Sequence, residues 1–131
     1  MYLLDSDTLV FLLRNHKSVT PRFRGEARQN LYTSIICISE LNYGAYKSGD
    51  VQKHLPPVQQ LARYLSVLPL DIASADQFGR LKAQLERQGQ RLNDADLWIA
   101  ATALSRNLTL VTHNQKHFAR IQQLNLEDWV V

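Results

Sequence analysis

The sequence predicts an α/β fold of three layers, in which helices cover both faces of a mainly parallel sheet of four to five strands. Three observations indicate it: short unbroken apolar runs recur, helical patterns lie between them, and no linker divides the 131 residues. An unbroken apolar run is typical of a strand that is buried on both faces. Strands separated by helices imply right-handed crossovers and parallel pairing. We therefore expect a single domain over residues 1–131.

The predicted strands are the short apolar runs. They are residues 2–4, 31–38, 67–70 and 108–112, with a fifth at 124–126 or 129–131. The second run is rich in β-branched residues, which favour strands. Pro69 interrupts the third run, so we expect that strand to be short and suited to an edge of the sheet.

Helical patterns fill the segments between these runs. Apolar residues recur at helical spacing over residues 71–88 and 94–106, and Gly89 and Asn107 end these two helices. Capping residues and apolar spacing predict three earlier helices. One opens at Thr20 with Pro21 in its first position, one is capped by Ser39 and runs to Ser48, and one covers residues 51–65, where Pro56 and Pro57 break or bend it.

Composition excludes several classes of protein. The hydrophobic fraction of 45% and the charged fraction of 21% are those of a soluble globular domain. The single cysteine, Cys37, lies in the apolar stretch SIICIS and is expected to be a small buried thiol. With no possible intramolecular disulfide, no basic leader and no long apolar run, we expect a cytoplasmic protein that has no contact with a membrane. The net charge of +3 permits attraction to a polyanion.

Polar residues follow three of the predicted strands, where open α/β sheets bind their ligands. They are Asp5, Ser6 and Asp7 after the first strand, Ser39 and Glu40 after the second, and Thr112, His113 and Asn114 after the fourth. Asp94 and Asp96 begin the helix that leads into the fourth strand. Since the carboxyl ends of parallel strands share one edge, we expect these side chains to meet there.

Carboxylates gathered at one edge indicate a bound cation. At an effective dielectric constant near 20 each close pair repels by several kcal/mol, and one carboxylate would take up a proton if nothing neutralised it. Oxygen ligands without cysteine or histidine favour Mg²⁺ or Mn²⁺ over Zn²⁺. Because Mg²⁺ retains water molecules, such a site can activate water for attack on a phosphodiester.

Several neighbouring residues have a second interpretation. Asp7 is equally suited to cap the first helix, and Asp94 to cap the helix in which Asp96 is the favoured ligand. Arg91 and Lys116 flank the acidic edge and are the expected phosphate contacts. The spacing of His113 and His117 lacks the context of a zinc site, so neither is assigned. Tyr43 and Tyr46 could be either core or partner-binding surface.

Four stretches carry a resemblance to a known family. They are LLDSDTLV, ISELNYGA, DADLWIAATAL, and LVTHNQKHF followed by LEDWV, and together they span almost the whole chain. In this order and spacing they resemble the PIN-domain ribonucleases, and among them the VapC toxins of toxin–antitoxin pairs. The resemblance implies an α/β/α sandwich, RNA cleavage that depends on Mg²⁺ or Mn²⁺, a homodimer and inhibition by a cognate antitoxin. Transfer RNA and ribosomal RNA are both open as targets.

The resemblance also implies roles for individual residues. The metal ligands are expected to be Asp5, Glu40, Asp96 and Asn114. Ser6 occupies the position of a Ser or Thr that orders the site and its water, and Thr112 that of a hydroxyl residue beside the fourth ligand. Asp7 replaces a more frequent Asn. Asn114 in place of Asp lowers the charge of the site, which leaves the number of metal ions open.

Other functions are compatible with parts of the pattern. DSDTLV after a strand resembles the opening of haloacid-dehalogenase phosphatases, with Asp5 as nucleophile, but Thr8 falls one position early and the expected later lysine with an acidic pair is absent. A phosphoacceptor receiver needs a lysine after the fifth strand, and none follows Lys116. A catalytically inactive PIN-like binding module would keep the fold and bind Mg²⁺ weakly. The favoured hypothesis is a metal-dependent endoribonuclease that needs no side-chain nucleophile.

Overall fold

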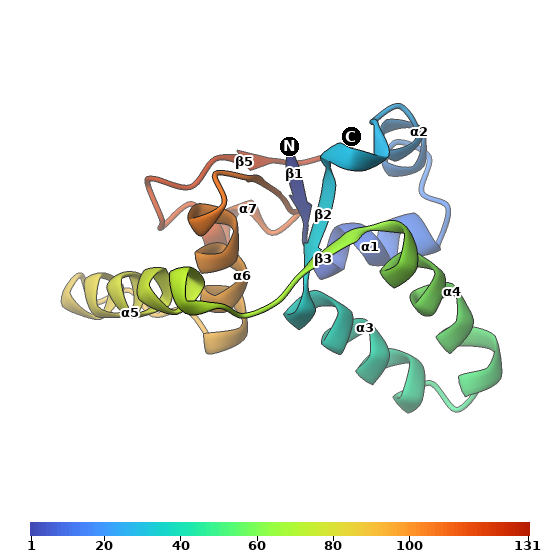
Figure 1. Cartoon of the computed structure of the whole chain (residues 1–131), viewed down its shortest axis with the longest axis horizontal. Coiled ribbons are helices and arrows are strands. Elements are labelled where there is room, and N and C mark those ends of the chain that lie inside the picture. The colour runs from blue at the N-terminus through green and yellow to red at the C-terminus, as the bar shows by residue number, and fades with distance from the viewer.

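Five parallel strands form one sheet in the order β3-β2-β1-β4-β5 (Figure 1). The computed structural model describes all residues from 1 to 131. The strands are β1 (Tyr2–Leu4), β2 (Leu31–Ser34), β3 (Ser66–Leu68), β4 (Thr109–Val111) and β5 (Leu126–Glu127). The predicted parallel α/β sheet is confirmed, and β3 lies at an edge, as the proline in that segment indicated.

Seven α-helices and one 3₁₀ turn connect the strands. They are α1 (Ser6–Leu13), α2 (Val19–Arg24), the turn η1 (Arg28–Asn30), α3 (Ile35–Lys47), α4 (Val51–Tyr64), α5 (Ile72–Arg87), α6 (Asp94–Ser105) and α7 (Gln115–Phe118). The chain moves from β1 to β2 and β3 in one direction, then returns to β4 and β5 on the other side of β1. Because such crossovers are right-handed, α1 to α4 cover one face of the sheet and α5 to α7 the other (Figure 1).

The core lies between the sheet and its two helix layers. Central strand residues are fully buried, and alanines of α6 bring that helix close to the sheet and to α5. The fully buried residues include Leu3, Leu4, Leu9, Leu31, Ile99, Ala100, Ala101, Leu110, Val111 and Phe118. None of the helices combines the length and the apolar character that crossing a membrane requires.

The second strand is shorter than predicted, because a helix begins at Ile35. The hydroxyl of Ser34 accepts a hydrogen bond from the Ile36 N–H at 2.9 Å, and this N-cap overrides the strand preference of the β-branched residues that follow. The prediction that Ser39 caps the helix was therefore wrong. The Ser39 hydroxyl instead donates to the Ile35 carbonyl at 2.8 Å. Glu40 consequently lies in the second helical turn.

Two other helix starts differ from the prediction. Ser18 is the N-cap residue of α2, so Pro21 is the third helical residue and Thr20 is buried, with a hydroxyl that has no hydrogen-bond partner. Asn93, and not Asp94, caps α6 by accepting the Asp96 N–H at 2.9 Å. In both helices the cap lies upstream of the residue that was expected.

The remaining elements follow the sequence pattern with small differences. Asp71 and Ser74 form a capping box at the start of α5, and Gly89 has φ +69° just beyond its end. The α4 helix continues through Pro56 and Pro57, which are exposed, while Val58 anchors its inner face in the core. The fifth strand, Leu126–Glu127, overlaps the end of the first of its two predicted positions, residues 124–126.

The early start of α3 can be tested by removing its cap. We expect Ser34→Ala to lower the free energy of unfolding by about 1 kcal/mol, because the Ile36 N–H loses its acceptor. Ser39→Ala should change it by less than about 0.5 kcal/mol, since that hydroxyl is exposed. Urea unfolding of the two variants measures the difference, and equal effects would contradict the capping role of Ser34.

Candidate metal centre

Asp5 and Thr112 lie side by side at the carboxyl edge of the sheet because β1 and β4 pair in parallel. Leu4 pairs with Val111, and the Asp5 N–H continues the ladder by donating to the Val111 carbonyl at 2.9 Å. The Thr112 hydroxyl donates to Asp5 Oδ2 at 2.8 Å. The chain leaves β1 and β4 in opposite directions, so these residues lie at the switch point where open α/β sheets bind ligands.

The Asp5 carboxylate is held in a nearly dry position, with 5% of the residue exposed. It is the N-cap residue of α1, and Oδ1 accepts the Ser6 N–H at 2.8 Å. Burial raises its pKa to about 7, with a further increase from the charge of Asp7, while the Thr112 and Ser6 hydrogen bonds oppose the shift. Near neutral pH the proton on Asp5 is therefore loosely held, and a cation can replace it.

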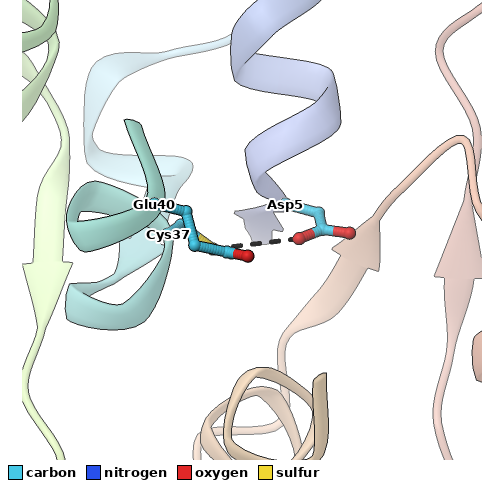
Figure 2. Close-up of side chains that lie close together, drawn as sticks. All are labelled: Asp5, Cys37 and Glu40. Carbon is cyan, nitrogen blue, oxygen red and sulfur yellow. Dashed lines mark hydrogen bonds between the residues drawn. The ribbon is translucent and has the colours of Figure 1, made fainter. Parts of the chain in front are cut away.

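Glu40 and Cys37 approach Asp5 from α3, where their i, i+3 spacing places them on one face (Figure 2). One potential ligand atom from each of these three residues lies within 4.8 Å of the other two. Burial raises the pKa of Glu40, and the charges of Asp96 and Asp7 raise it further, against the effect of the Ser6 hydroxyl. The structure thus brings together the first and second predicted ligands.

Cys37 lies closer to the site than its expected packing role implied. Its Sγ is 3.9 Å from Asp5 Oδ1, and the side chain is fully buried (Figure 2). Burial and the neighbouring Asp5 charge raise the pKa of the thiol, so it stays protonated and acts as a weak hydrogen-bond donor. The sequence signal for a position of Cys37 beside the site was its i, i+3 spacing to Glu40, which places both side chains on one face of a helix.

Asp96 lies in the first turn of α6, in the opposite helix layer. Its charge raises the pKa of both Asp5 and Glu40. The tight group of ligand atoms does not include Asp96. Its Oδ2 accepts hydrogen bonds from Asn93 Nδ2 at 2.9 Å and from His117 Nδ1 at 3.0 Å.

Asp7 ties the first turn of α1 to the segment after β4. Its Oδ2 accepts the His113 N–H at 3.1 Å and lies 3.3 Å from the Thr112 hydroxyl, and its Oδ1 accepts the Thr8 N–H at 2.6 Å. Asp5 is the N-cap residue of α1, so the alternative in which Asp7 caps this helix was wrong. Asp7 instead supports Thr112, which in turn holds Asp5.

Ser6 and Asn114 lie next to the hydrogen bonds that join Asp5, Asp7 and Thr112, and their side chains make fewer hydrogen bonds of their own. The Ser6 hydroxyl is 3.5 Å from Asp5 Oδ1, and it also lowers the pKa of Glu40. The Asn114 N–H donates to the Thr112 hydroxyl at 3.1 Å, while its exposed side chain makes no hydrogen bond within the chain. The Asn114 amide oxygen is therefore free to bind a ligand.

The residues predicted to support the site or to bind phosphate, Asp94, Arg91 and Lys116, do not lie together. Asp94 makes an ion pair with Lys82 at 3.1 Å, and both line a small cavity with Arg91 that contains neither Asp5 nor Glu40. The Arg91 carbonyl accepts a hydrogen bond from the Arg120 side chain. Lys116 is exposed on α7, two residues beyond Asn114. Phosphate contacts by Arg91 and Lys116 stay predictions.

Two histidines that the sequence left unassigned bind different aspartates. His113 Nδ1 lies 3.0 Å from Asp128, and His117 Nδ1 lies 3.0 Å from Asp96. Their spacing indicated a common helical face, but His113 precedes α7 and the two rings contact separate partners. The sequence carries no local signal for either pair, because the aspartates are 15 and 21 residues away.

A groove extends from Glu40 between α1, α3 and α4. Its walls are apolar with three basic side chains, and Glu40 forms part of its lining. The lining residues are Val10, Leu13, Arg14, Glu40, Leu41, Gly44, Ala45, Ser48, Lys53, His54, Pro57 and Val58. A bound chain in this groove would therefore reach the candidate metal centre.

The acidic side chains lie at the switch point of a parallel sheet, and sequence comparison identifies a family to which this arrangement belongs. The chain belongs to the PIN domain family, whose sequence profile matches residues 2–124. Within that family its relatives are VapC ribonucleases. Ribonuclease VapC1 of Haemophilus influenzae (strain R2866) is 31% identical over 98% of both chains. The tRNA(fMet)-specific endonuclease VapC of Salmonella typhimurium is 37% identical over 98% of this chain and 97% of its own.

Solved structures give the same result. VapBC-1 from nontypeable Haemophilus influenzae matches with a TM-score of 0.89 and 32% identity, over 99% of this chain and 98% of that one. DNA-bound VapBC from Salmonella typhimurium matches with a TM-score of 0.89 and 34% identity, over 98% of this chain and 97% of that one. The resemblance to PIN-domain VapC proteins is therefore confirmed in both sequence and fold.

Burial of Asp5 predicts an unusual dependence of stability on pH. Its pKa of about 7 in the folded chain exceeds the ordinary value of 3.8, so the folded state binds the proton more tightly. Without metal, protonated Asp5 contributes on the order of 4 kcal/mol to the free energy of unfolding. This contribution is complete below about pH 4 and is lost as pH rises through about 7. We expect Asp5→Asn, measured in chelator by urea unfolding, to remove much of this loss.

The matched control is Asp50→Asn, because Asp50 is also an N-cap aspartate but is exposed. Its free energy of unfolding should follow the wild type between pH 5 and 8. If the free energy of unfolding fell with pH at the same rate in the wild type and in Asp5→Asn, the burial of a charged Asp5 would not be destabilising.

Proposed function

We propose that this chain is a Mg²⁺-dependent endoribonuclease, with Mn²⁺ as an alternative ion, and the toxin of a toxin–antitoxin pair. The observation that carries the proposal is the convergence of Asp5 and Glu40, from two separate crossovers, within 4.8 Å. The charge of Asp96 on α6 raises the pKa of both acids, and the exposed Asn114 follows β4. Oxygen atoms on several elements around one point suit a hard divalent cation.

The metal would be held by Asp5, Glu40, Asp96 and Asn114. When bound, it supplies Lewis-acid activation of water and neutralises charge on the leaving oxygen. Burial raises the pKa of both Asp5 and Glu40, so a bound cation would offset the cost of keeping these two carboxylates charged. Thr112 fixes Asp5 Oδ2, and Ser6 lies beside Asp5 to orient the acids and water.

Attack on phosphorus requires no side chain of the protein as nucleophile. Asp5 is a poor nucleophile, since Oδ1 is bound to the Ser6 N–H, Oδ2 is bound to the Thr112 hydroxyl, and 5% of the residue is exposed. Cys37 is buried and protonated. These contacts argue against the phosphatase alternative with an Asp5 phosphoryl intermediate.

RNA is the substrate that the charges and the relatives support. The relatives are named as ribonucleases, and those of Shigella flexneri and Salmonella typhimurium as endonucleases specific for tRNA(fMet). The groove beside Glu40 presents Arg14 and Lys53, which suit phosphates, and Lys116 flanks Asn114. A loop of a structured RNA fits such an edge better than a regular duplex, whose deep groove side chains cannot enter.

Protein partners form the rest of the proposal. The related solved structures are VapBC complexes, which supports a cognate antitoxin for this chain. Tyr43 and Tyr46 are 65% and 63% exposed on α3 and give an apolar surface for a partner or a second copy. We place the homodimer and its antitoxin in the cytoplasm, where the RNA substrate is found.

Cleavage of total cellular RNA tests the metal-dependent mechanism. We expect Asp5→Asn and Asp96→Asn each to lower the rate by at least about 100-fold, because each removes a charge that holds the ion. Chelator should abolish wild-type cleavage and Mg²⁺ should restore it. Asp50→Asn, outside the site, serves as the control and should cleave like the wild type.

Three outcomes would separate the alternatives. Equal rates in the wild type and both variants would end the nuclease assignment. Trapping of a phosphoryl group on Asp5 would support the phosphatase alternative. Absence of Mg²⁺ binding in calorimetry, together with absence of cleavage, would support a catalytically inactive binding module.

A further inference from the structure

The two carboxylate oxygens of Asp96 have different environments. Oδ2 accepts hydrogen bonds from Asn93 Nδ2 at 2.9 Å and from His117 Nδ1 at 3.0 Å, whereas Oδ1 has no hydrogen-bond partner in the chain. The Asp96 side chain is 17% exposed, so rotation of the group would remove two partners from Oδ2 in a mostly buried position. One oxygen is thereby fixed, and the other is available.

Both donors are themselves held in place. Asn93 is the N-cap residue of α6, and its Oδ1 accepts the Asp96 N–H at 2.9 Å, so the two residues bond in both directions. His117 lies on α7, where the next residue, Phe118, is fully buried and anchors the short helix. The Phe118 ring meets the imidazole edge to face at 6.5 Å. The imidazole therefore reaches Asp96 from a rigid support.

The direction of the His117 hydrogen bond follows from its partner. An ionised carboxylate can only accept, so the proton must be on Nδ1 of the imidazole. A histidine that orients a ligating carboxylate in this way is an outer-shell contact of the kind that tunes metal affinity. Apart from Asn93 at the start of α6, no other residue donates a side-chain hydrogen bond to Asp96.

We propose that His117 is a positioning residue that fixes Asp96 with Oδ1 directed to Asp5 and Glu40, and that it thereby sets the affinity of the centre for a divalent cation. This inference rests on the proposed metal centre, because Asp96 must be a ligand for its orientation to matter. It assigns to α7 a function beyond packing. The cation affinity, and not the fold alone, should depend on the side chain at position 117.

His113 offers a matched comparison within the same segment. Its Nδ1 lies 3.0 Å from Asp128, the same distance as in the His117 pair, and both rings pack edge-on against a phenylalanine. Asp128 is not a candidate ligand. A purely structural role for such pairs would make the two histidines equivalent in a metal-binding measurement.

The test is titration of the full chain with Mn²⁺, followed by electron paramagnetic resonance or calorimetry. We expect His117→Ala to weaken Mn²⁺ binding about 10- to 100-fold, because Asp96 loses an orienting donor. His117→Asn places an amide nitrogen near the position of Nδ1 and should keep the affinity within about threefold of the wild type. His113→Ala should change it less than about twofold.

Two further variants make the result decisive. Asp96→Asn reports on the metal centre itself, and the double variant Asp96→Asn with His117→Ala should bind no more weakly than Asp96→Asn alone. If His117→Ala is poorly folded in a melt with chelator, His117→Phe retains a ring beside Phe118 without the donor and should show the same loss of affinity.

The failures are distinguishable. Wild-type affinity in His117→Ala or in a folded His117→Phe, with Asp96→Asn weakened, would overturn the role of His117 and leave the metal centre intact. Wild-type affinity in Asp96→Asn would overturn the proposed metal centre itself. An equal loss in His113→Ala and His117→Ala would show a structural effect of the segment and would also overturn the inference.

Discussion

The structure depends on one buried acidic group, the carboxylate of Asp5 at the end of the central strand. Its strand has neighbours on both sides, so the residue that follows is buried even though it is acidic. Hydrogen bonds from Ser6 and Thr112 stabilise the charged form, but burial outweighs them and raises its pKa. Burial of this charge lowers the stability of the metal-free fold at neutral pH, and the proposed cation would offset that cost.

The order of the strands places the other helices and segments of the candidate site around the Asp5 carboxylate. The α1 helix begins directly after Asp5, so its N-terminal dipole favours negative charge there. The Ser34 cap starts α3 early enough to place buried Cys37 and exposed Glu40 on the face that points to Asp5. The reversal of the chain across β1 brings α6 and the segment after β4 from the opposite layer. Acids far apart in sequence therefore converge without any long loop.

Sequence alone predicted that Asp5 and Glu40 meet, but not all of what holds them. Asp5 follows β1, Glu40 lies on the helix that follows β2, and the parallel pairing of the strands brings both to one edge of the sheet. The end of β2 was missed because one serine hydroxyl at residue 34 outweighs a run of β-branched residues. His117 could not be found, since its contact with Asp96 depends on where a helix of four residues packs. Local patterns carry no such tertiary information.

The thiol of Cys37 bears on which ion the centre prefers. Thiolate is the form of cysteine that binds soft ions such as Zn²⁺, and the neutral thiol is a weak donor. Burial is the larger reason that Cys37 stays protonated, and the charge of Asp5 is the smaller one. Neutralising Asp5 with a cation would remove only the smaller cause. The thiol would therefore stay protonated in the loaded site, and the charged ligands would remain carboxylates, which favour Mg²⁺ or Mn²⁺.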